Sequence, residues 1–164
     1  MKLLSADETI DQLGWACLND LSTFGALSND VILELLHNGI VRQYGKGEFV
    51  TRLDQVAEDF QIVLSGCVAY YRRFDGRDVL TRNFKQGEQM GFDQMIGLLT
   101  QNGTDVAQQD SLILDVSSEQ FFRLHVDFPA DFGLLMINLA RELAREIEIL
   151  ENVIGLGTGW LEGE

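Results

Sequence analysis

The hydrophobic positions in the first quarter of the chain follow the 3.6-residue period of a helix. Four of them share one face of a predicted helix: Val31, Ile32, Leu35 and Leu36. Ser28 can cap the start of this helix, and Asn38-Gly39 can end it. An earlier helix is predicted across 8–21, with one glycine inside it. We therefore expect an N-terminal helical segment over 1–24.

From residue 40 to residue 116 the pattern changes to short apolar and β-branched stretches that are separated by glycines. The predicted strands are 40–44, 61–64, 68–71, 79–84 and 112–116. Asp75-Gly76 predicts a hairpin turn, because these residues accept the positive φ angles that such turns prefer. Short strands with regular glycine-marked turns are typical of a small antiparallel barrel or sandwich, which we assign to 25–128.

After Pro129 the pattern becomes helical again. Five apolar residues recur at alternating steps of three and four: Ala140, Leu143, Ile147, Leu150 and Ile154. This is the a/d spacing of a coiled coil, so it favours a helix over 129–154 that pairs with a second copy rather than packing only on its own β domain. The glycines at 155, 157 and 159 are expected to end the helix and leave a Gly-rich tail over 155–164.

Charge restricts the classes of partner. The 164 residues include 26 acidic and 12 basic side chains, a net charge of −14, which argues against contact with nucleic acid or an anionic membrane. Four arginines form one basic cluster, interpreted as a solvated hairpin surface: Arg72, Arg73, Arg77 and Arg82. The sequence has no secretory signal and no stretch apolar enough to span a bilayer, so we expect a cytoplasmic protein.

Four short motifs, taken in order, resemble the cyclic nucleotide-binding domain family. They lie at 44–50 (YGKGEFV), 60–68 (FQIVLSGCV), 87–91 (GEQMG) and 107–111 (AQQDS). Phe121 and Pro129 also stand where that family has a Phe and a Pro ahead of its dimer helix. Each motif is weak alone, but the ordered set covers about 24–154. Within the family, the chain is similar to the bacterial catabolite-activator and fumarate-nitrate regulators.

The resemblance implies a mainly β fold with flanking helices. The expected architecture is a small antiparallel double-stranded β-helix, or jelly-roll barrel, with N-terminal helices and a long C-terminal dimer helix, forming a homodimer. Transcription factors of this branch follow the dimer helix with a helix-turn-helix domain, and the present sequence ends about where that domain would begin. We therefore expect no direct DNA binding.

The resemblance also places a phosphate-binding cassette at 91–107. The family uses a Glu for the ribose hydroxyl and an Arg for the cyclic phosphate, and these positions fall on Phe92 and Gln101. Asp93 could replace the Glu after a slip of one residue. The implied pocket residues are Gly91, Phe92, Asp93, Gln94, Gln101 and Asn102. We expect weak or absent binding of cyclic nucleotides, and recovery of binding when Phe92→Glu is combined with Gln101→Arg.

Enzymatic alternatives have little support in the sequence. A cupin-type metal site needs clustered His and carboxylate ligands, yet the chain has only His37 and His125, both outside the predicted strands. Cys67 reads as a small core residue, and with Cys17 it has neither disulfide nor metal spacing. The expectation is a non-enzymatic regulatory module without cofactor, sensing a small ligand or binding a protein partner. A genuine cyclic AMP or cyclic GMP sensor with an atypical cassette is the alternative.

Overall fold

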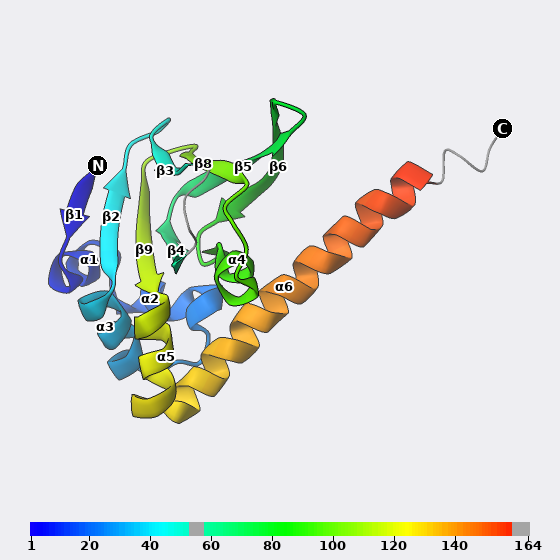
Figure 1. Cartoon of the computed structure of the whole chain (residues 1–164). Helices are drawn as coiled ribbons and strands as arrows, with labels where there is room; N and C mark the ends of the chain where they lie inside the picture. Colours follow the sequence, from blue (N-terminus) through cyan, green and yellow to red (C-terminus); the bar gives the residue numbers. More distant parts are fainter. Residues whose placement is uncertain (53–57, 159–164) are drawn as a thin grey trace.

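The strands of the middle region form two antiparallel sheets in a computed structural model, which describes residues 1–52 and 58–158 (Figure 1). One sheet has the order β1-β2-β9-β4-β7 and the other β3-β8-β5-β6. The strands are β1 (Lys2–Leu4), β2 (Ile40–Tyr44), β3 (Phe49–Thr51), β4 (Asp59–Ser65), β5 (Cys67–Phe74), β6 (Arg77–Lys85), β7 (Gln89–Met90), β8 (Gly103–Ala107) and β9 (Ser111–Ser117). With the flanking helices, these sheets confirm the predicted fold class.

The five predicted strands correspond to β2, β4, β5, β6 and β9, most of them extended by a few residues. The hairpin between β5 and β6 is also confirmed, since Asp75 and Gly76 have φ angles of 47° and 77°. Both central residues therefore take the positive φ of a type I′ turn. The sequence pattern missed β1, β3, β7 and β8, which hold at most two consecutive apolar residues. As β1 pairs with β2, the segment 1–24 is not purely helical.

The helices are α1 (Ala6–Leu13), α2 (Trp15–Asp20), α3 (Asn29–Asn38), α4 (Phe92–Gly97), α5 (Ser118–Asp127) and α6 (Pro129–Thr158), with a 3-10 turn η1 (Ser22–Phe24). The prediction for α3 is confirmed, including its Ser28 cap. The single helix predicted across 8–21 is wrong: it breaks into α1 and α2 at Gly14. The φ of 77° at Gly14 is incompatible with a continuing helix and is accessible to glycine at little steric cost.

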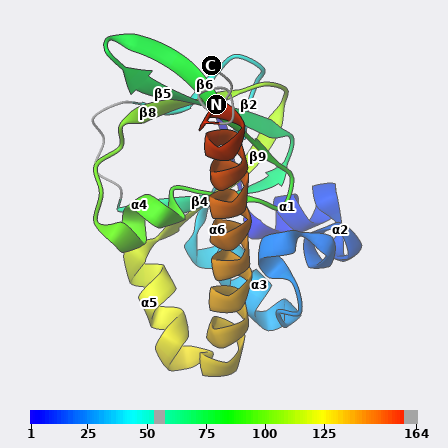
Figure 2. The same ribbon diagram turned by 90° about the vertical axis from the view of Figure 1, so that its right-hand side faces the viewer.

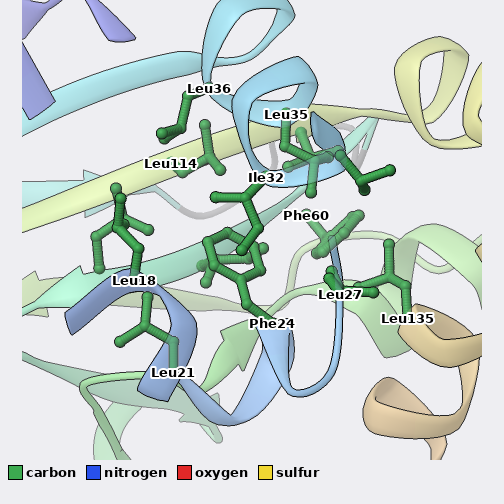
Figure 3. Close-up of a cluster of buried hydrophobic side chains, with 14 of the residues drawn as sticks. Leu18, Leu21, Phe24, Leu27, Ile32, Leu35, Leu36, Phe60, Leu114 and Leu135 are labelled. Atoms are coloured by element: carbon green, nitrogen blue, oxygen red, sulfur yellow. The ribbon is translucent and has the colours of Figure 1, made fainter. Parts of the chain in front are cut away.

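The central strands β4 and β9 are covered on both faces, which explains why neighbouring apolar residues follow one another in each. Side chains from the N-terminal helices, including Phe24 and Ile32, gather against Phe60 and Leu114 on one face of the first sheet (Figure 3). On the other face, Val63 joins a second cluster to which strands of both sheets contribute. Alternate residues of β4 thus pack into two different cores, so the second cluster lies inside the barrel.

The last helix leaves the barrel after packing against it. Leu135 and Leu139 are fully buried, whereas Ile147 and Ile154 are about three-fifths exposed, and Figure 2 shows α6 running past the sheets. Contrary to prediction, α6 continues through Gly155 to Thr158. A glycine costs a helix interior only about 1 kcal/mol, so it does not end a helix on its own. The rest of the predicted tail, 159–164, lies outside the described residues.

The described helices include none with the length and apolar character that a bilayer span requires.

Candidate functional site

A cavity of about 310 Å³ opens between the two sheets, and α4 and α6 complete its wall. Its described lining residues come from eight strands, two helices and the adjoining segments: Arg42, Tyr44, Val50, Thr51, Glu58, Asp59, Gln61, Tyr70, Arg82, Phe84, Gln89, Met90, Gly91, Asp93, Gln94, Gln101, Asp105, Asp115 and Glu146. This volume lies at the lower end of the range for small-molecule sites. We refer to it as the barrel cavity.

Four of the six predicted pocket residues line the barrel cavity: Gly91, Asp93, Gln94 and Gln101. The other two lie elsewhere. Asn102 is exposed, and its Oδ1 accepts a hydrogen bond of 2.8 Å from the Tyr70 hydroxyl. Phe92 is only 2 % exposed and belongs to the core beneath the helices. Asp93, which the one-residue shift of the motif offered as the alternative to Phe92, therefore lines the cavity where Phe92 was predicted to lie.

Phe92 is held by other aromatic rings. Its ring centroid lies 5.4 Å from that of Phe60 and 5.6 Å from that of Phe121, and both contacts are edge-to-face. Its backbone N–H donates to Gln89 Oε1 at 3.1 Å. A carboxylate in place of this ring would enter an apolar core instead of facing a ligand. The structure therefore corrects the predicted position of Phe92, which lies in the core and not in the cavity wall.

Gln101 faces the barrel cavity, but its amide donor is already engaged. Its Nε2 lies 3.2 Å from Thr51 Oγ1 and 3.2 Å from Asp105 Oδ2, and the residue is buried. An arginine here would meet the Asp105 carboxylate, which would compete with a phosphate for the guanidinium. The expected recovery through Gln101→Arg therefore loses its geometric basis as well.

Asp105 is the most buried carboxylate of the barrel cavity. It is 4 % exposed on β8, and Thr51 Oγ1 and Gln101 Nε2 both donate to its Oδ2. Its Oδ1 has no hydrogen-bond partner within the described ranges 1–52 and 58–158. Burial raises the pKa of Asp105 to about 6, against the lowering effect of these two hydrogen bonds.

A second buried carboxylate, Asp115 on β9, forms an ion pair across the first sheet. Arg42 Nε lies 2.7 Å from Asp115 Oδ2. Burial nevertheless raises the pKa of Asp115 to about 6, because removal from water outweighs the attraction of Arg42. Burial also raises the pKa of Asp59, and that of Asp93, where Glu146 adds to the effect.

Two contacts join the cavity wall to α6. Arg82 on β6 forms an ion pair with Glu146, and its guanidinium lies 4.3 Å from the centroid of the Phe84 ring. Arg82 therefore lies at the cavity, not on the solvated hairpin surface predicted for it. Deeper along α6, Glu142 is 6 % exposed and accepts hydrogen bonds from Ser22 Oγ and Thr23 Oγ1. The backbone N–H of Gln89, a lining residue, donates to Glu142 Oε2 at 2.9 Å.

The sequence interpretation missed Asp105 because it predicted no strand at 103–107. In β8 the buried positions are Gly103, Asp105 and Ala107, which is the strict alternation of a strand with one face in the barrel. Recognition of this alternation would have placed the Asp105 carboxylate inside. Among the residues that the structure describes, no three His, Cys, Asp or Glu side chains are grouped so that they could hold a metal ion.

A family model for the cyclic nucleotide-binding domain matches residues 41–127, more than half of the chain. Comparison with curated proteins gave no match.

Three similar solved structures illustrate the fold. A cyclic nucleotide-binding domain from Methylobacillus flagellatus is 17% identical with a TM-score of 0.77, and the match covers 94% of this chain and 88% of that one. The catabolite activator protein of Thermus thermophilus is 23% identical with a TM-score of 0.68, covering 84% and 63%. The sensor domain of the transcriptional regulator DNR from Pseudomonas aeruginosa is 22% identical with a TM-score of 0.64, covering 85% and 94%. The present chain thus spans under two thirds of the catabolite activator protein.

Proposed function

Because this chain belongs to the cyclic nucleotide-binding domain family, we propose that it is a non-enzymatic regulatory module that senses a small ligand in the barrel cavity. The observation that carries the proposal is the cavity itself, whose wall includes buried polar side chains and two contacts to α6. A ligand that moves these side chains would change the environment of α6. The 164 residues of the sequence carry a net charge of −14, which does not attract the phosphates of DNA. No direct DNA contact is therefore part of the proposal.

A screen of small metabolites by thermal shift and calorimetry tests this function. A saturable ligand that raises the melting temperature supports a sensor, since a ligand that binds the native state stabilises it by mass action. If no metabolite of any charge class binds, sensing is excluded and a scaffold that binds a protein partner takes its place.

We expect the ligand to differ from a cyclic nucleotide. The cassette region 91–107 contains no Arg or Lys, and the side-chain amide of Gln101 donates its hydrogen bond to the Asp105 carboxylate. A lost charge-assisted contact to phosphate removes about 1.5–3 kcal/mol, or one to two decades of affinity, and the carboxylates add repulsion.

Calorimetry with cyclic AMP and cyclic GMP should therefore show no saturation at micromolar concentrations. A family member whose phosphate-binding cassette has both the Arg and the Glu is the positive control. Micromolar or tighter binding by the unmodified chain would instead favour the alternative, a genuine cyclic nucleotide sensor with an atypical cassette.

We further propose that α6 forms a homodimer through its distal half. Of the predicted seam, Ile147, Leu150 and Ile154 are more than half exposed, and apolar side chains in such a row are suited to pairing with a second helix. Leu143 instead packs against the core of its own chain, and Ala140 is exposed beside it. The distal residues are therefore the ones to test.

Leu150→Glu combined with Ile154→Glu should convert the dimer to a folded monomer, because two carboxylates would enter the apolar seam of each helix. Light scattering at tens of micromolar, an approximate working range for a seam of about two heptads, measures the change. Glu148→Gln with Glu151→Gln, exposed on the same helix, is the matched control and should remain dimeric. A monomeric wild-type chain in this range would exclude the proposed dimer.

A further inference from the structure

We propose that the barrel cavity binds a small organic cation, with an ammonium or guanidinium group placed beside the Asp105 carboxylate. This inference rests on the proposed sensing function and names the chemical class of its ligand. Three observations support it: the charge of the wall, the buried carboxylate without a paired cation, and the aromatic rings in the same wall.

The wall carries more negative than positive side chains. In the described part of the chain, six carboxylates and two guanidiniums line the cavity. Both guanidiniums are already committed, Arg42 to Asp115 and Arg82 to Glu146. The remaining lining carboxylates form no ion pair with a described residue: Glu58, Asp59, Asp93 and Asp105. At neutral pH, the cavity therefore favours a cation over an anion.

Asp105 shows where the positive group would bind. Its side chain is held by Thr51 and Gln101 through one oxygen, so the carboxylate has a fixed orientation. The other oxygen is buried and has no partner in the described residues, although buried acceptors in proteins are nearly always satisfied. The negative charge of this carboxylate has no paired cation among the described residues, so it would attract a ligand ammonium or guanidinium, and a charge-assisted hydrogen bond to a carboxylate is stronger than a neutral one.

The rest of the wall suits an organic cation. Tyr44 and Tyr70 contribute aromatic rings, and the faces of such rings attract ammonium and guanidinium groups, as the Phe84 ring already does with Arg82. The volume of about 310 Å³ corresponds to roughly ten water molecules, which limits the ligand to a small metabolite. A bare metal ion is disfavoured because the described carboxylates do not converge in a group of three.

The test uses four-carbon probes that differ in charge. Putrescine carries two ammonium groups, 1,4-butanediol is neutral and succinate carries two carboxylates, while agmatine adds a guanidinium. Calorimetry and thermal shift at pH 7.5 and constant ionic strength should show saturable binding for putrescine or agmatine, and none for butanediol or succinate.

Asp105→Asn should weaken the binding of the cationic probe by about 10–100-fold, the range expected for one charge-assisted contact. Asp11→Asn, on an exposed position of α1 outside the cavity wall, is the matched control and should leave the affinity unchanged. Asp59→Asn is a second variant at an exposed lining position, so it tests the charge of the wall even if Asp105→Asn does not fold. It should weaken binding several-fold.

Three outcomes would overturn the inference: no saturation by either cation, equal binding of the neutral diol, or an unchanged affinity in a folded Asp105→Asn variant. These outcomes are distinct from a failure of the proposed function. If a neutral or anionic metabolite from the wider screen binds and raises the melting temperature, the sensing function stands and the cationic class is wrong.

Discussion

Replacing Phe92 with Glu is expected to unfold the protein, and replacing it with Ala to lower the free energy of unfolding by about 3–5 kcal/mol. The Phe92 ring is 2 % exposed and meets Phe60 and Phe121 edge-to-face. Its removal leaves a cavity in the core, and a carboxylate placed there must also lose its hydration. A domain of this kind has only about 5–15 kcal/mol of stability in total, so the Glu variant should not remain folded.

Urea denaturation measures the Ala variant, and circular dichroism at 25 °C shows whether the Glu variant is folded. Phe122→Ala is the matched control, because Phe122 is a neighbouring ring that is 59 % exposed, and its loss should cost less than about 1 kcal/mol. If Phe92→Glu folded normally and bound a cyclic nucleotide together with Gln101→Arg, the placement of Phe92 in the core would be wrong.

The ligand-free protein is expected to become more stable as the pH falls from 7 to 5. Asp105 and Asp115 have pKa values of about 6 in the folded state, against an ordinary value of 3.8. Between these values the folded state binds more protons than the unfolded state, so its stability rises as the pH decreases. Each group contributes about 1 kcal/mol over this interval, and the pair about 2–3 kcal/mol.

The gain in stability on acidification ends at a lower limit of pH. Below about pH 4 both states are protonated at these groups, so their contribution no longer increases. The pKa of Glu8 and that of Glu48 are lowered, each chiefly by a hydrogen bond from a backbone N–H, so these groups lose stabilising interactions in that same acidic range. A maximum of stability on the acidic side of neutrality is the expected profile.

Chemical denaturation at pH 7.5, 6 and 5, at one protein concentration, measures this profile. Asp105→Asn removes one of the two groups with a pKa of about 6, so it should reduce their joint contribution to the gain by about half. Charged neighbours act on both groups, Asp93 on Asp105, and Arg42 and Asp59 on Asp115, and these remain in the variant. A steady loss of stability from pH 7 to pH 5 in the wild-type chain would show that the two carboxyl groups titrate normally.

The strands β4 and β9 could be predicted from the sequence because both of their faces are buried, which leaves a run of three apolar residues in each, 62–64 and 112–114. The same reasoning failed for β8, where Gly103, Asp105 and Ala107 face the barrel and offer no such run. The sequence pattern therefore did not predict Asp105 as a residue of the cavity wall, although buried and less buried residues alternate along β8 as in an ordinary strand.

Phe92 could not be placed because its position depends on the register of a short helix. Successive residues in a helix point about 100° apart, so a shift of one residue exchanges a core position for a cavity position. In α4 that difference separates Phe92, in the core, from Asp93, in the wall. The motif spacing predicted the segment that contributes Gly91, Asp93 and Gln94 to the wall. Spacing alone does not determine which side of α4 faces the cavity.

Glu142 anchors the proximal part of α6, so it would be the pivot of any tilt of the part beyond it. Three hydrogen bonds hold this carboxylate against the barrel, from Ser22, Thr23 and the backbone of Gln89. With a rise of about 1.5 Å per residue, the helix between Glu142 and Thr158 is about 24 Å long, so a tilt of about 5° at the pivot moves its far end by about 2 Å. A tilt that started at the cavity wall would therefore displace the end of the helix more than any other part of it.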